Sequence, residues 1–129
     1  MRDIGNRQKV FNLQEAQALL PLLVKITERH ISELEPIQYR LNRMLSNDPR
    51  RPSVEAQFEV VVARWKVKVE QLGASASGLW LIDFDVGDGL LSWRYPELSI
   101  AYVRGYDSAF SSRRRLTEYI EEQDPDWAC

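Results

Sequence analysis

Apolar residues recur at alternating spacings of three and four along the N-terminal part of the chain. The series runs from Leu13 to Met44, and eight of its ten positions are apolar. This spacing is typical of one face of a long, coiled-coil-like helix. Asn12 and Glu15 match a capping box, in which each side chain binds the other residue's backbone amide. A helix is therefore predicted over residues 13–45. Its seam consists of Leu13, Ala16, Leu20, Leu23, Thr27, His30, Leu34, Ile37, Leu41 and Met44.

Two prolines lie within the first predicted helix, and a second helix follows it. Pro21 and Pro36 each remove one amide donor, but the seam keeps its register across both, so kinks are expected rather than breaks. After the turn-forming residues 46–52, a second helix is predicted over residues 53–72. The β-branched residues 60–62 are its least helix-like part. The short connection makes the two helices antiparallel neighbours.

The apolar period changes to two after the second helix. Residues 74–78 are predicted to be a linker of small residues, and three strands are predicted at 79–84, 90–95 and 99–104. A meander of this size needs a helix over one face, and the helical hairpin is the obvious cover. Residues 111–123 can form a C-terminal helix, although their arginines precede their glutamates, which is the reverse of what the helix dipole favours.

The predicted fold class is therefore α+β, a long antiparallel helical hairpin packed on a small three-stranded antiparallel sheet, with a short C-terminal helix as an option. The composition, with 44% hydrophobic and 28% charged residues, is that of an ordinary globular chain. All 129 residues are predicted to form a single domain. Its parts are the helical hairpin at 11–72, the β-meander at 78–105 and a C-terminal segment at 106–129.

The net charge and the cysteine content limit the partners and the cellular location that are expected for this chain. The formal net charge of −2 is too small to indicate a nucleic-acid or membrane partner, and no basic stripe alternates with aromatic residues. The one cysteine, Cys129, cannot form an internal disulfide. The longest apolar run, residues 18–24, contains Pro21 and is too short to span a bilayer. With neither an export signal nor a disulfide framework, a cytoplasmic location is expected.

Several short motifs occur in a fixed order along the chain. They are Val10-Phe11-Asn12-Leu13-Gln14-Glu15-Ala16 with Leu19-Leu20-Pro21, then Gly78 with Ile82-Asp83-Phe84, then Leu91-Ser92-Trp93-Arg94, and finally Glu97, Ile100, Phe110 and Arg113. Together they resemble the bacterial domain-of-unknown-function 2203 family from Phe11 to Leu116. The resemblance implies the fold of that family but no reaction, because the family's function is itself unassigned.

This chain departs from the family's pattern at positions suited to chemistry. Ser92 stands where the family has a cysteine before the tryptophan, and Val103 stands where a histidine usually follows the aromatic residue of the third strand. The glycine before Glu97 is replaced by Pro96. If the family uses that cysteine and histidine as ligands, or as nucleophile and base, this chain cannot do so in the same way.

His30 is the only histidine, which excludes a two-histidine metal site. With Thr27 it forms one polar layer in the apolar seam, and such layers fix helix register at a cost in stability. We expect both residues to lie inside a helical interface and His30 to make a hydrogen bond there. Replacing His30 by leucine should then raise the melting temperature while loosening the oligomeric state or register. A ligand-binding or pH-sensing His30 is the alternative.

No catalytic residue, metal site or cofactor is predicted. Residues 83–89 contain alternating carboxylates, but their spacing is not that of an EF-hand loop, and Arg94 occupies the position of its bidentate glutamate. A charged hairpin turn explains these residues better. Nothing in the sequence brings two of these carboxylates, or Glu97, into one pocket, so the sequence does not support an enzyme.

The arginines are the candidates for ligand binding. Arg113 follows two serines at the predicted start of the C-terminal helix, where free amides and a guanidinium group can converge on an anion. Arg94 can contribute from a strand, and Glu97 would orient one of these guanidinium groups through a bidentate pair. The alternative is a solvated basic stretch that pairs with the acidic C-terminal residues.

The sequence leaves three hypotheses about function. The first is a self-associating interaction module, most simply a homodimer, because the first helix exceeds the second by about thirteen residues and would expose its seam. The second is a domain that binds a small anion, phosphate or carboxylate, through Arg94, Glu97 and Arg113. The third is an enzyme that uses clustered carboxylates with a divalent metal.

Overall fold

The structure, a computed structural model, describes residues 9–128, so the first eight residues and Cys129 lie outside the described part. Two helices form an antiparallel hairpin, α1 (Leu13–Asn42) and α2 (Arg51–Gln71). Five strands form one antiparallel sheet in the order β1-β2-β3-β4-β5. The strands are β1 (Ser75–Gly78), β2 (Leu81–Asp85), β3 (Leu90–Arg94), β4 (Tyr102–Arg104) and β5 (Arg114–Arg115). The remaining elements are η1 (Phe110–Ser112), α3 (Leu116–Gln123) and η2 (Asp126–Ala128).

The predicted α+β class and the helical hairpin are confirmed. At the start of α1, the Glu15 amide donates to Asn12 Oδ1 at 2.7 Å and the Asn12 amide donates to Glu15 Oε1 at 2.9 Å, which completes the capping box. The helix continues through Pro21 and Pro36. It has 30 residues against 21 for α2, so the difference in length is smaller than the sequence suggested.

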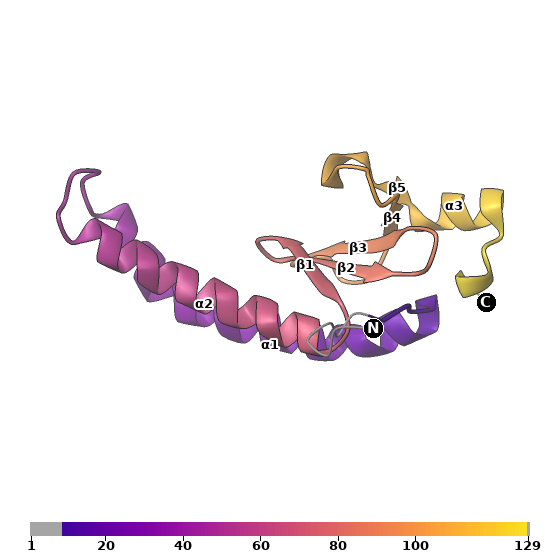
Figure 1. Cartoon of the computed structure of the whole chain (residues 1–129), viewed down its shortest axis with the longest axis horizontal. Helices are drawn as coiled ribbons and strands as arrows, with labels where there is room; N and C mark the ends of the chain where they lie inside the picture. The colour runs from indigo at the N-terminus through magenta and orange to yellow at the C-terminus, as the bar shows by residue number, and fades with distance from the viewer. Residues whose placement is uncertain (1–8, 129) are drawn as a thin grey trace, which may run out of the picture.

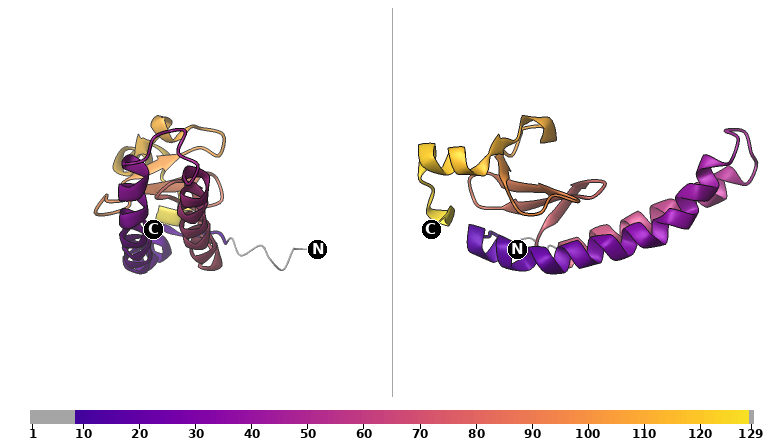
Figure 2. Two further views of the ribbon diagram at one scale, coloured as in Figure 1. Left: turned by 90° about the vertical axis from the view of Figure 1, so that its left-hand side faces the viewer. Right: turned by 180° about the vertical axis from the view of Figure 1, so that it is seen from behind.

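The hairpin is longer than the sheet and lies across one of its faces (Figures 1 and 2). The N-terminal half of α1 and the C-terminal half of α2 lie under the sheet, and we call this the proximal half of the hairpin. The distal half, which ends in the loop between α1 and α2, projects beyond the sheet, and the hairpin curves along its length. No helix within residues 9–128 is long and apolar enough to cross a membrane.

The hydrophobic core lies between the proximal half of the hairpin and the sheet. Ile82 pairs with Trp93 across β2 and β3, and Phe84 pairs with Leu91, so all four side chains lie on the same face of the sheet. Apolar side chains of the helices meet this face and are removed from water, which is the main stabilising contribution. The fully buried members of this core include Ala16, Leu23, Trp65, Val69, Ile82, Phe84, Leu91 and Trp93.

The prediction of three strands is wrong, because the sheet has five. Residues 75–78 form β1 although they are small and show no alternation, since their backbone pairs with β2. The strand predicted from residue 79 begins at Leu81 because Trp80 has a φ of 60° and turns the chain. Its ring packs edge-to-face on Trp65 at 4.9 Å, which offsets the cost of a left-handed conformation at a bulky residue.

The C-terminal helix exists, but it is shorter than predicted. Residues 110–112 form η1 and residues 114–115 pair with β4 as β5, and α3 begins only at Leu116. The Leu116 amide donates to the carbonyl of Ala101 at 2.9 Å, which joins the start of α3 to the sheet. Three arginines would be unfavourable in the first turn of a helix, and the structure places them before it.

Candidate functional site

The face of the sheet turned away from the hairpin carries polar side chains, and we call it the outer face. Asp83, Ser92 and Tyr102 are successive cross-strand partners on this face. Arg104 lies two residues along β4 from Tyr102 and donates from Nη2 to Asp83 Oδ2 at 2.6 Å. The side chain of Asp83 is 3% exposed and that of Arg104 is 10% exposed. This buried ion pair was not predicted from the sequence.

Three buried polar atoms near this pair have no hydrogen-bond partner among the described residues. They are Asp83 Oδ1, Ser92 Oγ and Arg104 Nε. Arg104 also donates from Nη1 to the carbonyl of Ser108, so its guanidinium group joins β4 to the following loop. The two opposite charges therefore compensate each other in an environment shielded from water. Removing either partner would leave a buried charge unpaired, which is costly in stability.

Glu97 and Arg113 form a second ion pair at the other end of the outer face. Arg113 donates from Nη1 and Nη2 to the two carboxylate oxygens of Glu97 at 3.1 and 2.9 Å. Its guanidinium carbon lies 4.0 Å from the ring centroids of both Tyr102 and Phe110. The group is thus bound along its edge by a carboxylate and on its faces by aromatic rings, which is a stable arrangement for arginine.

The structure brings together the three predicted ligand-binding residues, Arg94, Glu97 and Arg113. The backbone amide of Arg94 donates to Glu97 Oε1 at 2.9 Å, and its guanidinium carbon lies 5.8 Å from the centroid of Phe110. Glu97 therefore connects Arg94 and Arg113. An anion that bound Arg113 would have to displace Glu97, so the observed contacts of Arg113 serve to hold the segment before β5 on the sheet.

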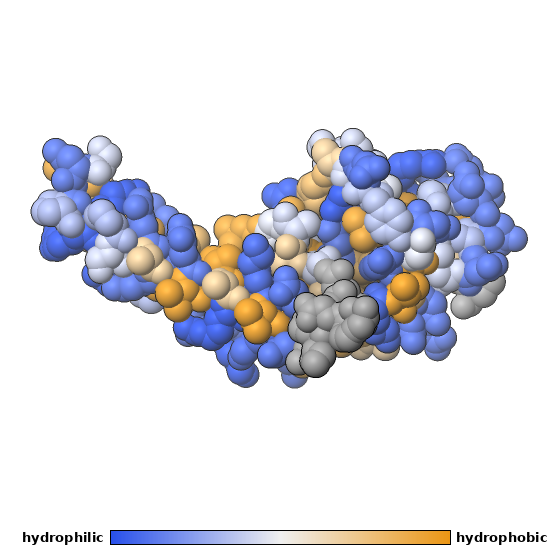
Figure 3. Space-filling model, in the orientation of Figure 1, coloured by the Kyte–Doolittle hydropathy of each residue, from blue (hydrophilic) through white to orange (hydrophobic). Residues whose placement is uncertain are grey.

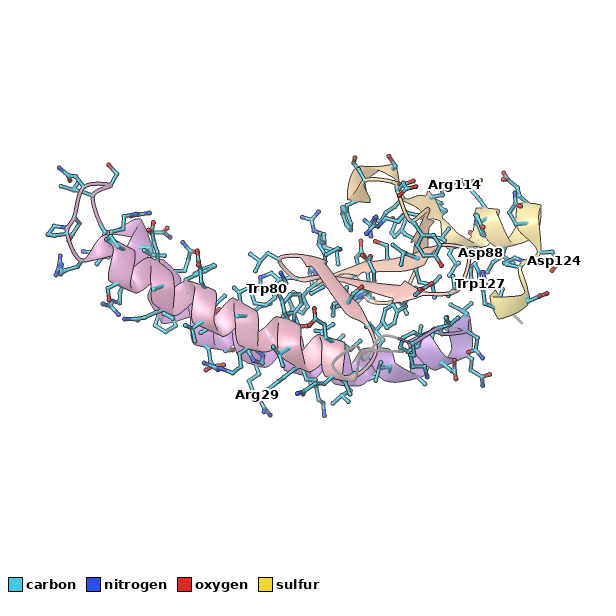
Figure 4. All side chains as sticks on the ribbon, viewed as in Figure 1. Arg29, Trp80, Asp88, Arg114, Asp124 and Trp127 are labelled. Atoms are coloured by element: carbon cyan, nitrogen blue, oxygen red, sulfur yellow. The ribbon has the colours of Figure 1, made fainter. Side chains whose placement is uncertain are left out.

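Two carboxylates at the end of β2 and in the following turn accept hydrogen bonds from side chains of the same chain. Asp85 Oδ1 accepts from the Tyr106 hydroxyl at 2.6 Å, and this hydrogen bond raises the pKa of Tyr106 to about 12. Asp88 Oδ1 accepts from Trp127 Nε1 at 2.9 Å (Figure 4). Within residues 9–128, no three His, Cys, Asp or Glu side chains are grouped in a way that could hold a metal ion.

The polar layer of Thr27 and His30 lies within one chain. Both side chains are fully buried, and Thr27 Oγ1 accepts a hydrogen bond from Trp65 Nε1 of α2 at 2.9 Å. His30 Nδ1 donates to the carbonyl of Ile26 at 2.7 Å, while its Nε2 has no partner among the described residues. The register that this layer can fix is therefore that of α1 against α2 in the same protomer.

His30→Leu is expected to raise the free energy of unfolding by about 1–2 kcal/mol, because it removes a buried acceptor for which the described part of the chain offers no donor. Since the layer lies inside the protomer, the assembly state should stay unchanged. Urea unfolding, followed by circular dichroism, and light scattering measure the two effects. His30→Gln, which keeps a polar group in the layer, is the control and should not stabilise the protein. A loss of stability in His30→Leu would contradict this account.

The outward side of α2 carries a row of exposed apolar residues that the sequence interpretation missed. Ala56, Val60, Ala63 and Val67 are all exposed, and Val60 and Val67 are 58% and 50% exposed. Figure 3 shows apolar surface along α2. We call these four residues the α2 stripe. Their spacing of four, three and four is present in the sequence, but the β-branched run at residues 60–62 conceals it.

The α2 stripe lies opposite the buried side of the same helix. At 100° per residue, its four positions point nearly the opposite way from the buried positions. The buried positions are Val54, Val61, Trp65 and Val69. Helix α2 therefore has two apolar faces, of which one packs inside the protomer and the other is exposed among residues 9–128.

The fold and its sites define a class of protein, an α+β domain in which a helical hairpin supports a five-stranded antiparallel sheet with a charged outer face. A family model described as "Uncharacterized conserved protein (DUF2203)" matches residues 9–116, and the chain belongs to this family. No curated protein and no solved structure matches the chain. The resemblance drawn from the sequence motifs is thereby confirmed.

Proposed function

We propose that this chain is an interaction module that associates with itself through its helical hairpin. The observation that supports this proposal is the α2 stripe, an apolar row of heptad-like spacing on a helix whose other apolar face is already buried. Contiguous exposed apolar rows on a stable helix are typical of interaction surfaces. Val60 and Val67 are β-branched residues, which pack well at the core of helix pairs.

The α2 stripe is more exposed than the part of the α1 seam that lies in the distal half of the hairpin. Ile37, Leu41 and Met44 of the seam are half-buried in the single chain. The α2 stripe, by contrast, lies away from α1, so a partner can cover it without disturbing the hairpin. The surface proposed for association is therefore α2, and the interaction is that of one helix with another.

The wild-type protein is expected to be a dimer at micromolar concentration in light scattering. The double variant Val60→Glu/Val67→Glu places two charges in the stripe, and burying unpaired charges is costly, so it is expected to be a monomer. Because neither side chain is part of the protomer core, circular dichroism should show an unchanged helix content.

The matched control is Leu22→Glu, which alters an apolar side chain of similar exposure on α1, 47% exposed, outside the stripe. This variant should remain dimeric. A wild-type protein that is monomeric at micromolar concentration would overturn the proposed function, and a Leu22→Glu variant that is also monomeric would place the interface elsewhere.

A further inference from the structure

We infer that the partner of the α2 stripe is the α2 stripe of a second copy of this chain, lying antiparallel to it. This inference rests on the proposed function and adds the identity, direction and register of the partner helix. In an antiparallel helix pair, the two kinds of seam position face each other, so a valine of one chain can fill the space beside an alanine of the other. The inferred register places Val60 opposite Ala63 of the second copy and Val67 opposite its Ala56.

The alternation of large and small residues supports the antiparallel direction. Along α2 the stripe reads Ala56, Val60, Ala63 and Val67. A parallel pair in register would set valine against valine and alanine against alanine, leaving alternate layers wide and narrow. The antiparallel pair sets a large residue against a small one in all four layers, which keeps the distance between the helices constant and packs them without voids.

The position of the stripe along the helix supports the register. The inferred two-fold axis passes between residues 61 and 62, midway between Val60 and Ala63. Helix α2 runs from Arg51 to Gln71, so its midpoint lies at residue 61. The antiparallel register therefore overlaps the two helices along their whole length of about 30 Å. It also sets the projecting distal half of each hairpin beside the proximal half of the other.

The charges along one edge of the stripe are complementary in this register. Glu59 and Lys66 are exposed and lie on the same side of the stripe, one position before Val60 and Val67 respectively. In antiparallel helix pairs, these flanking positions meet their equivalents in the partner, so Glu59 faces Lys66 of the second copy. The two-fold axis repeats this contact, giving two pairs of opposite charge. On the other edge, Arg64 is held by Glu33 of its own chain at 2.9 Å.

Cysteine cross-linking in a Cys129→Ser background tests the direction. The variants are Ala56→Cys, Val67→Cys and the double variant with both. Mild oxidation should convert the double variant into covalent dimers, and mixing the two single variants should give mixed dimers. Neither single variant should cross-link alone. Residues 56 and 67 of one helix are about 16 Å apart, beyond the reach of a disulfide within one chain.

Charge exchange tests the register. Glu59→Lys and Lys66→Glu should each weaken the dimer by about tenfold, because each replaces two attractions by two repulsions. The double variant Glu59→Lys/Lys66→Glu should recover most of the affinity. Lys25→Glu on α1, an exposed lysine outside the interface, is the control and should leave the dimer unchanged.

The outcomes separate this inference from the proposed function. Cross-linking of a single variant with itself, or no recovery in the charge-exchanged double variant, would overturn the inferred arrangement while leaving a dimer in place. A dimer in light scattering with no cross-link in any variant would have the same consequence. A wild-type monomer would overturn the proposed function and this inference together.

Discussion

Arg104→Met is expected to lower the free energy of unfolding by about 3–5 kcal/mol, because it leaves the buried carboxylate of Asp83 without its partner. The side chain of Asp83 is nearly inaccessible to water, and its Oδ1 already lacks a hydrogen bond among the described residues. The variant also removes the donor to the Ser108 carbonyl, which holds the following loop. Urea unfolding monitored by circular dichroism measures the loss.

Two further variants distinguish the buried pair from an ordinary ion pair. Asp83→Val/Arg104→Met removes both charges, and most of the lost stability should return because apolar residues of suitable size can replace a buried pair. Arg64→Ala breaks the exposed pair with Glu33 and should cost less than about 1 kcal/mol. Equal losses in Arg104→Met and Arg64→Ala would show that the Asp83–Arg104 pair contributes no more than a surface contact.

The helical hairpin could be predicted because its signals are local. The seam and the capping box lie within the helix that they determine. The same holds for the two longest strands, β2 and β3, whose apolar alternation and glycine-containing turn predict a β-hairpin. The family resemblance could also be found, because its motifs keep their order along the chain.

The edge strands could not be predicted, because their reasons are not local. Residues 75–78 carry no apolar alternation and become β1 only because β2 offers backbone partners. The two residues of β5 are arginines, and they pair with β4 because Glu97 holds the neighbouring Arg113. In both segments, tertiary contacts decide a structure for which the sequence has little propensity.

The buried ion pair of the outer face could not be predicted either, because it too depends on tertiary contacts. The partnership of Asp83 with Arg104 depends on the register of three strands, which the sequence does not specify.

The β propensity of the Val60-Val61-Val62 run conceals the helical pattern to which these residues belong. Val61 packs inside the protomer, Val62 is half-buried and Val60 is exposed, so neighbouring valines belong to different faces of one helix.

Trp65→Ala is expected to destabilise the protein by about 3–5 kcal/mol, the usual cost of deleting a large buried aromatic side chain. Trp65 is fully buried where α2 meets both α1 and the β1–β2 turn. It donates to Thr27 Oγ1 at 2.9 Å and packs edge-to-face against Trp80 at 4.9 Å. Tyr39→Ala removes an exposed aromatic residue of the distal hairpin and is the control, with an expected effect below about 0.5 kcal/mol.

The variant Trp65→Phe separates packing from hydrogen bonding at the same position. It keeps most of the ring volume and removes the donor to Thr27, whose hydroxyl can then donate to a carbonyl of its own helix. The expected cost is about 1–2 kcal/mol.

Thr27→Val should cost a similar amount, because it leaves the Trp65 N–H buried without an acceptor. In the double variant Thr27→Val/Trp65→Phe, neither partner is left unpaired, so its loss should be smaller than the sum of the single losses. Additive losses in this cycle would show that the hydrogen bond does not couple α1 to α2. A Trp65→Phe variant as unstable as Trp65→Ala would show that the hydrogen bond, rather than the packed ring, joins the two helices.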